Sequence, residues 1–121
     1  MKRFLSLCLI LGALAIAALA AEENRPPFRL AIVGLVHDHA QGFLGDLRSR
    51  HDVELAGIVE ANPVLVARYR ERYQLPAALF YPDLETMLAA TKVSAVAVCS
   101  STFDHAEIIR VCAAHGVHVM V

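Results

Sequence analysis

The sequence predicts an α/β fold: a doubly wound parallel sheet with helices on both faces, in a single domain. From Phe28 onward, short apolar runs typical of buried strands alternate with segments in which apolar residues recur at helical spacing. Strands and helices that alternate in this way form right-handed βαβ units and hence a parallel sheet. The chain has 121 residues, enough for one such domain, and no linker divides residues 28–121.

The first half of this region contains two pairs of strand and helix. An apolar run predicts a buried strand over Leu30–Val33, and apolar residues at helical spacing predict a helix over Ala40–Arg50. A second strand is expected over Val53–Glu60. Asn62 is a favoured N-cap residue and a proline follows it, so a helix should start at residue 63 and end at about Tyr73.

The second half continues the alternation and ends in a strand. Asp83 is placed to cap one helix and Gly116 to end another, because glycine readily adopts the left-handed conformation found at helix ends. The elements predicted here are a short strand within Pro76–Tyr81, a helix over Leu84–Ala90, a strand over Val93–Cys99, a helix over about Asp104–His115 and a strand that begins at Val117.

The N-terminal segment has the layout of a secretory signal peptide. A basic start, Met1–Arg3, precedes an almost wholly apolar run over Phe4–Leu19, and Ala18-Leu-Ala20 places small residues at the −3 and −1 positions of a cleavage site. We therefore expect residues 1–20 to be a signal peptide and residues 21–27 a linker to the folded domain, which is exported to the bacterial periplasm or the exterior. The alternative is an uncleaved N-terminal membrane anchor.

The charge pattern argues against a nucleic-acid partner. Removal of Lys2 and Arg3 with the signal peptide takes the basic residues from 11 to 9 against 12 acidic residues, a net charge of −3. Arginines cluster only over Arg68–Arg72, where Glu71 interrupts the run. This pattern is typical of a solvated helix face and lacks the basic patch that nucleic-acid binding requires.

A glycine follows the first strand, where nucleotide-binding α/β domains place their phosphate-binding turn. Gly34 lets the chain turn sharply, and the next helix would offer N–H groups to a pyrophosphate. Val36 and His39 occupy the second and third glycine positions of the G-x-G-x-x-G pattern. We favour a phosphate turn in which the β-branched Val36 keeps the ligand further from the backbone. An ordinary strand-to-helix turn is the alternative.

Glu60 ends the second strand, 26 positions after Gly34. A carboxylate at this place can accept both hydroxyls of the adenosine ribose of NAD, and it would repel the additional phosphate of NADP. A solvated acid at a strand end is the alternative interpretation. If a dinucleotide binds, the sequence favours NAD over NADP.

Three histidines are expected at one edge of the sheet. A strand order of 3-2-1-4-5 would place the loop with His37, Asp38 and His39 opposite the loop with Asp104 and His105. These side chains could line a polar pocket for cofactor and substrate. They could also form a zinc site, for which His-x-His with a distant histidine and an acid is chemically adequate. Helix capping by the two aspartates is the third interpretation.

Four stretches carry a resemblance to a known family: Arg29–Gly34, Glu54–Pro63, Tyr81–Leu88 and Val93–Val121. The last is the strongest, because it is similar to a pattern of strand, Thr-Pro-Asn-x-x-His turn, helix and Gly-x-His-Val strand. In this order and spacing, the four resemble the N-terminal half of the Gfo/Idh/MocA oxidoreductases, which include glucose–fructose oxidoreductase, inositol dehydrogenase and the rhizopine-catabolism protein. The resemblance covers residues 28–121.

The resemblance implies a Rossmann-like domain that binds NAD(P), joined in full-length members to an α/β substrate domain. It implies hydride transfer between NAD(P) and a sugar-like or polyol substrate. His105 matches the family histidine, whereas Ser101 and Thr102 replace the family proline and asparagine. The Glu-Lys-Pro motif with the catalytic lysine would follow Val121 directly. We therefore expect a fragment without the C-terminal substrate domain and without catalysis of its own, whose exposed apolar sheet edge favours self-association.

The residues expected to bind the cofactor follow three strands. No catalytic residue or metal ligand is assigned, because Lys92, the one lysine after the signal peptide, precedes the fourth strand and lies at the opposite edge of the sheet. The alternative function is a non-catalytic exported module that holds a polar ligand or metal at His37, His39 and His105. The cofactor-binding candidates are Gly34, Val36, His37, Asp38, His39, Glu60, Ser100, Ser101, Thr102 and His105.

Overall fold

Five parallel strands form one sheet in the computed structural model, which describes residues 25–121. The strands are β1 (Phe28–Val33), β2 (Val53–Val59), β3 (Phe80–Tyr81), β4 (Ala95–Val98) and β5 (His118–Met120). Their order in the sheet is β3-β2-β1-β4-β5, and every neighbouring pair is parallel. The predicted doubly wound sheet and its strand order are therefore confirmed.

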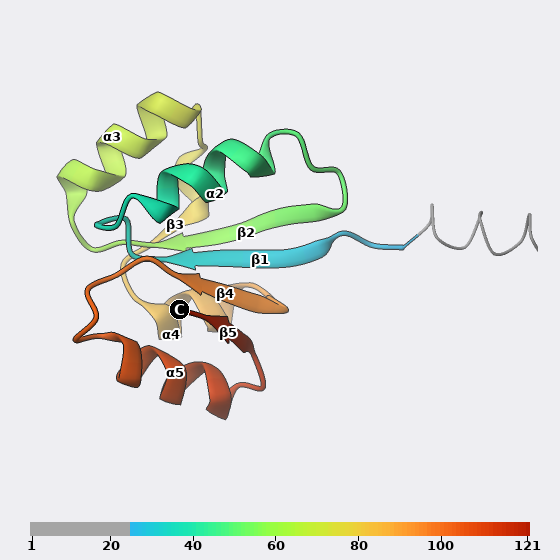
Figure 1. The fold of residues 1–121 in the computed structure, drawn as a ribbon, viewed down its shortest axis with the longest axis vertical. Coiled ribbons are helices and arrows are strands. Elements are labelled where there is room, and N and C mark those ends of the chain that lie inside the picture. The colour runs from blue at the N-terminus through green and yellow to red at the C-terminus, as the bar shows by residue number, and fades with distance from the viewer. Residues whose placement is uncertain (1–24) are drawn as a thin grey trace, which may run out of the picture.

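Helices cover both faces of the sheet. α2 (His39–Leu47) and α3 (Pro63–Tyr73) lie on one face, and α4 (Leu84–Ala90) and α5 (His105–Ala114) lie on the other (Figure 1). Each helix returns the chain to the start of the next strand, as parallel pairing requires. The loops that follow β1, β2 and β4 consequently gather at one edge of the sheet, on the left in Figure 1. We call this the carboxyl edge.

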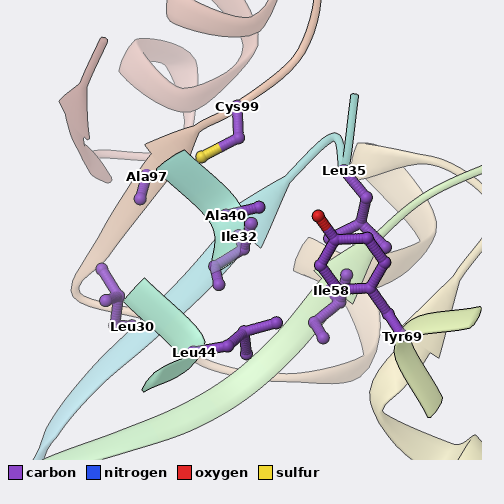
Figure 2. Packing of buried hydrophobic residues seen from close by; sticks show 9 residues of the cluster. All are labelled: Leu30, Ile32, Leu35, Ala40, Leu44, Ile58, Tyr69, Ala97 and Cys99. Carbon is purple, nitrogen blue, oxygen red and sulfur yellow. The ribbon is translucent and has the colours of Figure 1, made fainter. Parts of the chain in front are cut away.

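The sheet divides the core into two apolar layers. Along β1, Leu30 and Ile32 belong to the layer under α2 and α3, whereas Ala31 and Val33 belong to the layer under α4 and α5. This follows because successive side chains of a strand face opposite sides. Figure 2 shows nine residues of the first layer, with Tyr69 of α3 beside its neighbours from the strands. Each fully buried aliphatic side chain stabilises the fold by roughly 1.5–3 kcal/mol.

Two predicted strand boundaries are wrong, and strand pairing explains both. β1 begins at Phe28 instead of residue 30, because Phe28 is in register with Val53 at the start of β2. β4 covers four of the seven predicted residues. Only Ala95–Val98 are in register with Leu30–Val33 of β1, and the chain after Val33 turns away at Gly34.

α2 ends at Leu47, one turn earlier than predicted. Ser49 and Arg50 instead donate their N–H groups to the carbonyls three residues before them, at 3.1 and 3.2 Å. Such 3₁₀ geometry is common at the ends of α-helices. The short strand expected within residues 76–81 is confirmed as β3, after a 3₁₀ turn over Ala77–Leu79.

Most of the predicted N-terminal organisation lies outside the described residues. This holds for the signal peptide at residues 1–20 and for the first part of the linker at residues 21–27. Phe28 then anchors the start of the domain, because its N–H donates to the Asp52 carbonyl at 2.7 Å. Within residues 25–121, no helix is long and apolar enough to cross a membrane.

Candidate functional site

Backbone hydrogen bonds join the three loops at the carboxyl edge. The Gly34 N–H donates to the Val59 carbonyl at 2.8 Å, which ties the end of β1 to the end of β2. The His37 N–H donates to the Cys99 carbonyl at 3.1 Å, which ties the β1–α2 loop to the end of β4. The loops that the predicted strand order brings to one edge are therefore in direct contact with one another.

A glycine is needed at position 34 because the backbone there packs directly against the backbone of Ser100. Its φ is +84°, in the region that favours glycine. A Cβ added at Gly34 would lie 2.6 Å from both the Cα and the N of Ser100, far inside van der Waals contact. The β1–α2 and β4–α5 turns can touch only without a side chain here, so this glycine would be required even without a ligand.

Glu60 connects two of the loops through its carboxylate. Oε2 accepts the Leu35 N–H and Oε1 accepts the Asn62 N–H, both at 2.9 Å. A carboxylate oxygen has two lone-pair sites, so each oxygen retains acceptor capacity for a further donor. Glu60 thus lies where the sequence placed a ribose acceptor, but the sequence did not indicate its contact with Leu35.

Val36 points into solvent, with 69% of its surface exposed. Among residues 25–121, Gln74 is the only residue other than glycine with a positive φ, so Val36 imposes no left-handed strain on the loop. Neither the Val36 N–H nor the Asp38 N–H has a hydrogen-bond partner within the described part of the chain. Both amides are therefore free to meet an acceptor from outside.

The two aspartates expected to cap helices do not do so. Asp38 and Asp104 stand at the N-cap positions of α2 and α5, but neither side chain accepts a hydrogen bond from its helix backbone. Both have right-handed helical φ and ψ, whereas the successful caps Asn62 and Asp83 are extended. An N-cap side chain reaches the first turn only from an extended backbone. The capping interpretation of Asp38 and Asp104 is therefore wrong.

The histidines of the β1–α2 loop lie together at the surface. The ring centroids of His37 and His39 are 4.3 Å apart with the planes tilted by 47°, and both residues are exposed. His105 is the first residue of α5 and is partly buried. Within residues 25–121, no three His, Cys, Asp or Glu side chains are grouped so that they could hold a metal ion. The geometry therefore gives the zinc interpretation no support.

The β4–α5 turn is held by its own serines. The Ser101 Oγ accepts the Phe103 N–H at 3.4 Å, and the Ser100 hydroxyl donates to the Ser101 carbonyl at 3.3 Å. The Thr102 carbonyl accepts the His105 N–H at 3.4 Å. Phe103 is 94% exposed. Local contacts thus shape this turn, although its sequence departs from the family pattern.

Tyr69 of α3 is a polar residue near the site that the sequence did not single out. It is 5% exposed and lies beside Leu35 in the core (Figure 2). Burial raises the pKa of the Tyr69 phenol, as it raises that of the Cys99 thiol, so both groups stay neutral at neutral pH. The sequence could have indicated this buried polar residue, because a tyrosine occupies a position of the helix that faces the core.

A groove of about 420 Å³ opens beside Glu60, between α3 and β3. Val66, Phe80, Tyr81 and Pro82 contribute largely apolar walls to it. The groove lies at the end of β2, next to the polar Glu60 carboxylate, and Arg70 of α3 also lines it.

A family model for the Gfo/Idh/MocA oxidoreductases, described as an NAD-binding Rossmann fold, matches residues 28–121. The chain belongs to this family. Its described domain is the family's NAD-binding Rossmann domain, with the five-stranded sheet and two helical layers found here. The resemblance seen in the sequence is thereby confirmed over its whole predicted extent.

Solved structures share this fold. The WlbA dehydrogenase from Chromobacterium violaceum, in complex with NADH and UDP-GlcNAcA, is 26% identical with a TM-score of 0.68 over 80% of this chain. An oxidoreductase from Agrobacterium radiobacter, in complex with NAD⁺, L-tartaric acid and magnesium, is 16% identical with a TM-score of 0.67 over 78%. Myo-inositol 2-dehydrogenase from Lactobacillus plantarum is 18% identical with a TM-score of 0.65, also over 78%.

The match covers a minor part of these longer proteins. The chain spans 27% of the length of each of the three. No curated protein sequence matches the chain significantly.

Proposed function

We propose that this chain binds NAD at the carboxyl edge of its sheet, as the nucleotide-binding part of a sugar or polyol oxidoreductase. The main support is the Glu60 carboxylate at the end of β2, next to the Gly34 turn. The adenosine ribose would bind Glu60, the adenine would lie in the apolar groove, and the pyrophosphate would meet the free amides of Val36 and Asp38 at the start of α2.

The other candidate residues complete this proposed site. His37 and His39 flank the phosphate turn, and the Ser100–Thr102 turn with His105 would face the nicotinamide half across the β1–β4 boundary. The donor set fits the dinucleotide, because it offers a carboxylate to hydroxyl groups and backbone N–H groups to phosphates. When bound, NAD would supply the hydride acceptor, while these residues would bind and orient it.

We also propose that NAD is preferred over NADP. The Glu60 carboxylate would repel a phosphate on the adenosine ribose, since like charges at close range cost several kcal/mol. Arg70 lines the same groove and is the group there that would attract that phosphate. The ratio of the NAD affinity to the NADP affinity therefore shows whether the repulsion by Glu60 or the attraction by Arg70 is stronger.

Calorimetric titration of the full chain with NAD and NADP tests these proposals. We expect heat from NAD at up to millimolar concentration and at least about tenfold weaker binding of NADP. Glu60→Ala should lose the NAD signal, whereas Glu71→Ala, which removes an exposed carboxylate of α3, should keep it. The absence of both heat and thermal shift with millimolar NAD would rule out cofactor binding by this chain.

For the substrate, a sugar-like or polyol compound is proposed. The support is that a relative 26% identical to this chain was solved with a nucleotide sugar acid. Residues 28–121 would supply the nucleotide half of the reaction, and no described residue is assigned to catalysis. We expect no NADH from this chain with NAD and inositol or glucose; measurable turnover would overturn that assignment.

The layout of residues 1–20 supports export from the cytoplasm as a further proposal. The mass of the protein purified from the producing cells would test it. A chain that begins at Ala21 is expected, and a full-length chain in the membrane fraction would instead indicate an anchor.

A further inference from the structure

We infer that Glu60 is also a positioning residue: its carboxylate holds the β1–α2 loop in the shape that presents free amides to a phosphate. The relevance to phosphate rests on the proposed function, whereas the contact itself belongs to the ligand-free protein. Ribose binding alone requires nothing of the loop, so the two roles of Glu60 can be separated.

Three hydrogen bonds anchor the loop to neighbouring strand ends. Gly34 donates to Val59, Leu35 donates to Glu60, and His37 donates to Cys99. The first and third use backbone carbonyls, which no substitution removes. The second uses the Glu60 side chain and holds the residue directly before Val36, whose N–H is one of the two free amides.

A carboxylate suits this contact better than any neutral side chain. Both of its oxygens accept and neither donates, so it can satisfy Leu35 and Asn62 at once. Its negative charge also lies at the start of α3, where the helix dipole favours it. Glutamine has nearly the same shape, but its NH₂ group would face one of the two donors and leave that N–H unpaired.

The electrostatic and positioning roles of Glu60 have opposite effects on an anion in the loop. By charge alone, the carboxylate repels a phosphate, so neutralising it should tighten the binding of inorganic pyrophosphate or leave it unchanged. If Glu60 shapes the loop, neutralising it should weaken the binding of pyrophosphate, although this ligand has no ribose to contact. The sign of the change therefore separates the roles.

Amide hydrogen exchange in the full chain without ligand tests the contact directly. In Glu60→Ala, which removes both acceptor oxygens, we expect the Leu35 amide to exchange at least about tenfold faster, the effect of losing a hydrogen bond to a charged group. Core amides such as those of Ile32 and Ile58 should stay unchanged, which distinguishes a local effect from global destabilisation. Glu54→Ala is the matched control on the same strand, because it removes a carboxylate bonded to Arg29 at the opposite end of β2.

Titration with inorganic pyrophosphate completes the test. Glu60→Ala should bind it about three- to tenfold more weakly than the unmodified chain, and Glu54→Ala should bind it equally well. Unchanged exchange at Leu35, or pyrophosphate binding in Glu60→Ala that is unchanged or tighter, would overturn the positioning role. If the unmodified chain binds neither pyrophosphate nor NAD, the proposed function fails, and the exchange result alone decides whether Glu60 holds the loop.

Discussion

Gly34 is constrained by its neighbours in the fold, whether or not a ligand binds. The sequence indicated a glycine at a phosphate turn, whereas the structure shows that a Cβ there would overlap the backbone of Ser100. A residue can thus match a binding pattern and still be needed for a packing reason. The glycine alone is therefore weak evidence for a dinucleotide, and Glu60 carries more of the argument.

Gly34→Ala should destabilise the domain by about 2–4 kcal/mol, because it adds left-handed strain to a backbone overlap. Thermal unfolding of the two proteins measures this loss. Gly116→Ala is the control, since Gly116 has a φ of +68° but open space around its Cβ position, so it should show only the smaller strain effect. Equal losses in both variants would mean that the Ser100 contact contributes nothing.

At the scale of elements, capping depends on backbone conformation as well as residue type. Asn62 and Asp83 cap α3 and α4 as the sequence predicts, with side-chain oxygens 2.9 and 2.7 Å from the Val64 and Thr86 amides. Asp38 and Asp104 are equally suitable residue types, but their helical φ and ψ prevent the same contact. Sequence patterns do not reveal this difference, because the turn geometry is set by loops packing across the sheet.

The cap of α4 should make stability depend on pH. The Thr86 N–H and then the Thr86 hydroxyl hold the pKa of Asp83 below its usual value, so the charged form favours the folded state. This stabilisation is complete above the ordinary aspartate pKa of about 3.9 and is lost as the pH falls through the lower folded value. The difference in melting temperature between the unmodified chain and Asp83→Ala should therefore shrink below about pH 4.

Asp83→Asn is the matched control for this prediction. It keeps an oxygen for the Thr86 N–H but cannot ionise, so its melting temperature at neutral pH should lie above that of Asp83→Ala. A difference between the unmodified chain and Asp83→Ala that stays constant down to strongly acidic pH would contradict the role given to the carboxylate.

At the scale of the whole molecule, β5 forms one edge of the sheet next to β4 (Figure 1). Met120 and Val121 are 49% and 67% exposed there. An apolar edge strand with unpaired backbone groups is a template for pairing with another chain. The predicted self-association remains a proposal, supported by this edge.

Met120→Lys should reduce self-association, because a lysine on an edge strand disfavours pairing with a second sheet. Sedimentation velocity over a range of concentrations measures the effect. Ile109→Lys is the control, since it charges an exposed apolar residue that belongs to α5 and not to the edge strand. A chain that stays monomeric at its highest soluble concentration, or equal effects of both variants, would contradict a role for β5.

The order and type of the elements could be predicted from the sequence by itself. Alternating apolar patterns, Asn62 with its proline, Asp83 and Gly116 identify strands, helices and several of their ends, because these signals act over a few neighbouring residues. The same local signals identified Gly34 and Glu60 as candidate binding residues and carried the family resemblance that was then confirmed.

Only the tertiary structure decided what these residues contact. The approach of Gly34 to Ser100 and the bonds from Glu60 to Leu35 and Asn62 join segments 66, 25 and 2 positions apart in the chain. The first two depend on β1 lying between β2 and β4. The strand order was expected from the alternating pattern, but the packing of the loops against one another is set by burial over the whole sheet, so local patterns do not specify it. For this reason, the ends of β1 and β4, the uncapped α2 and the second role of Glu60 emerged only from the fold.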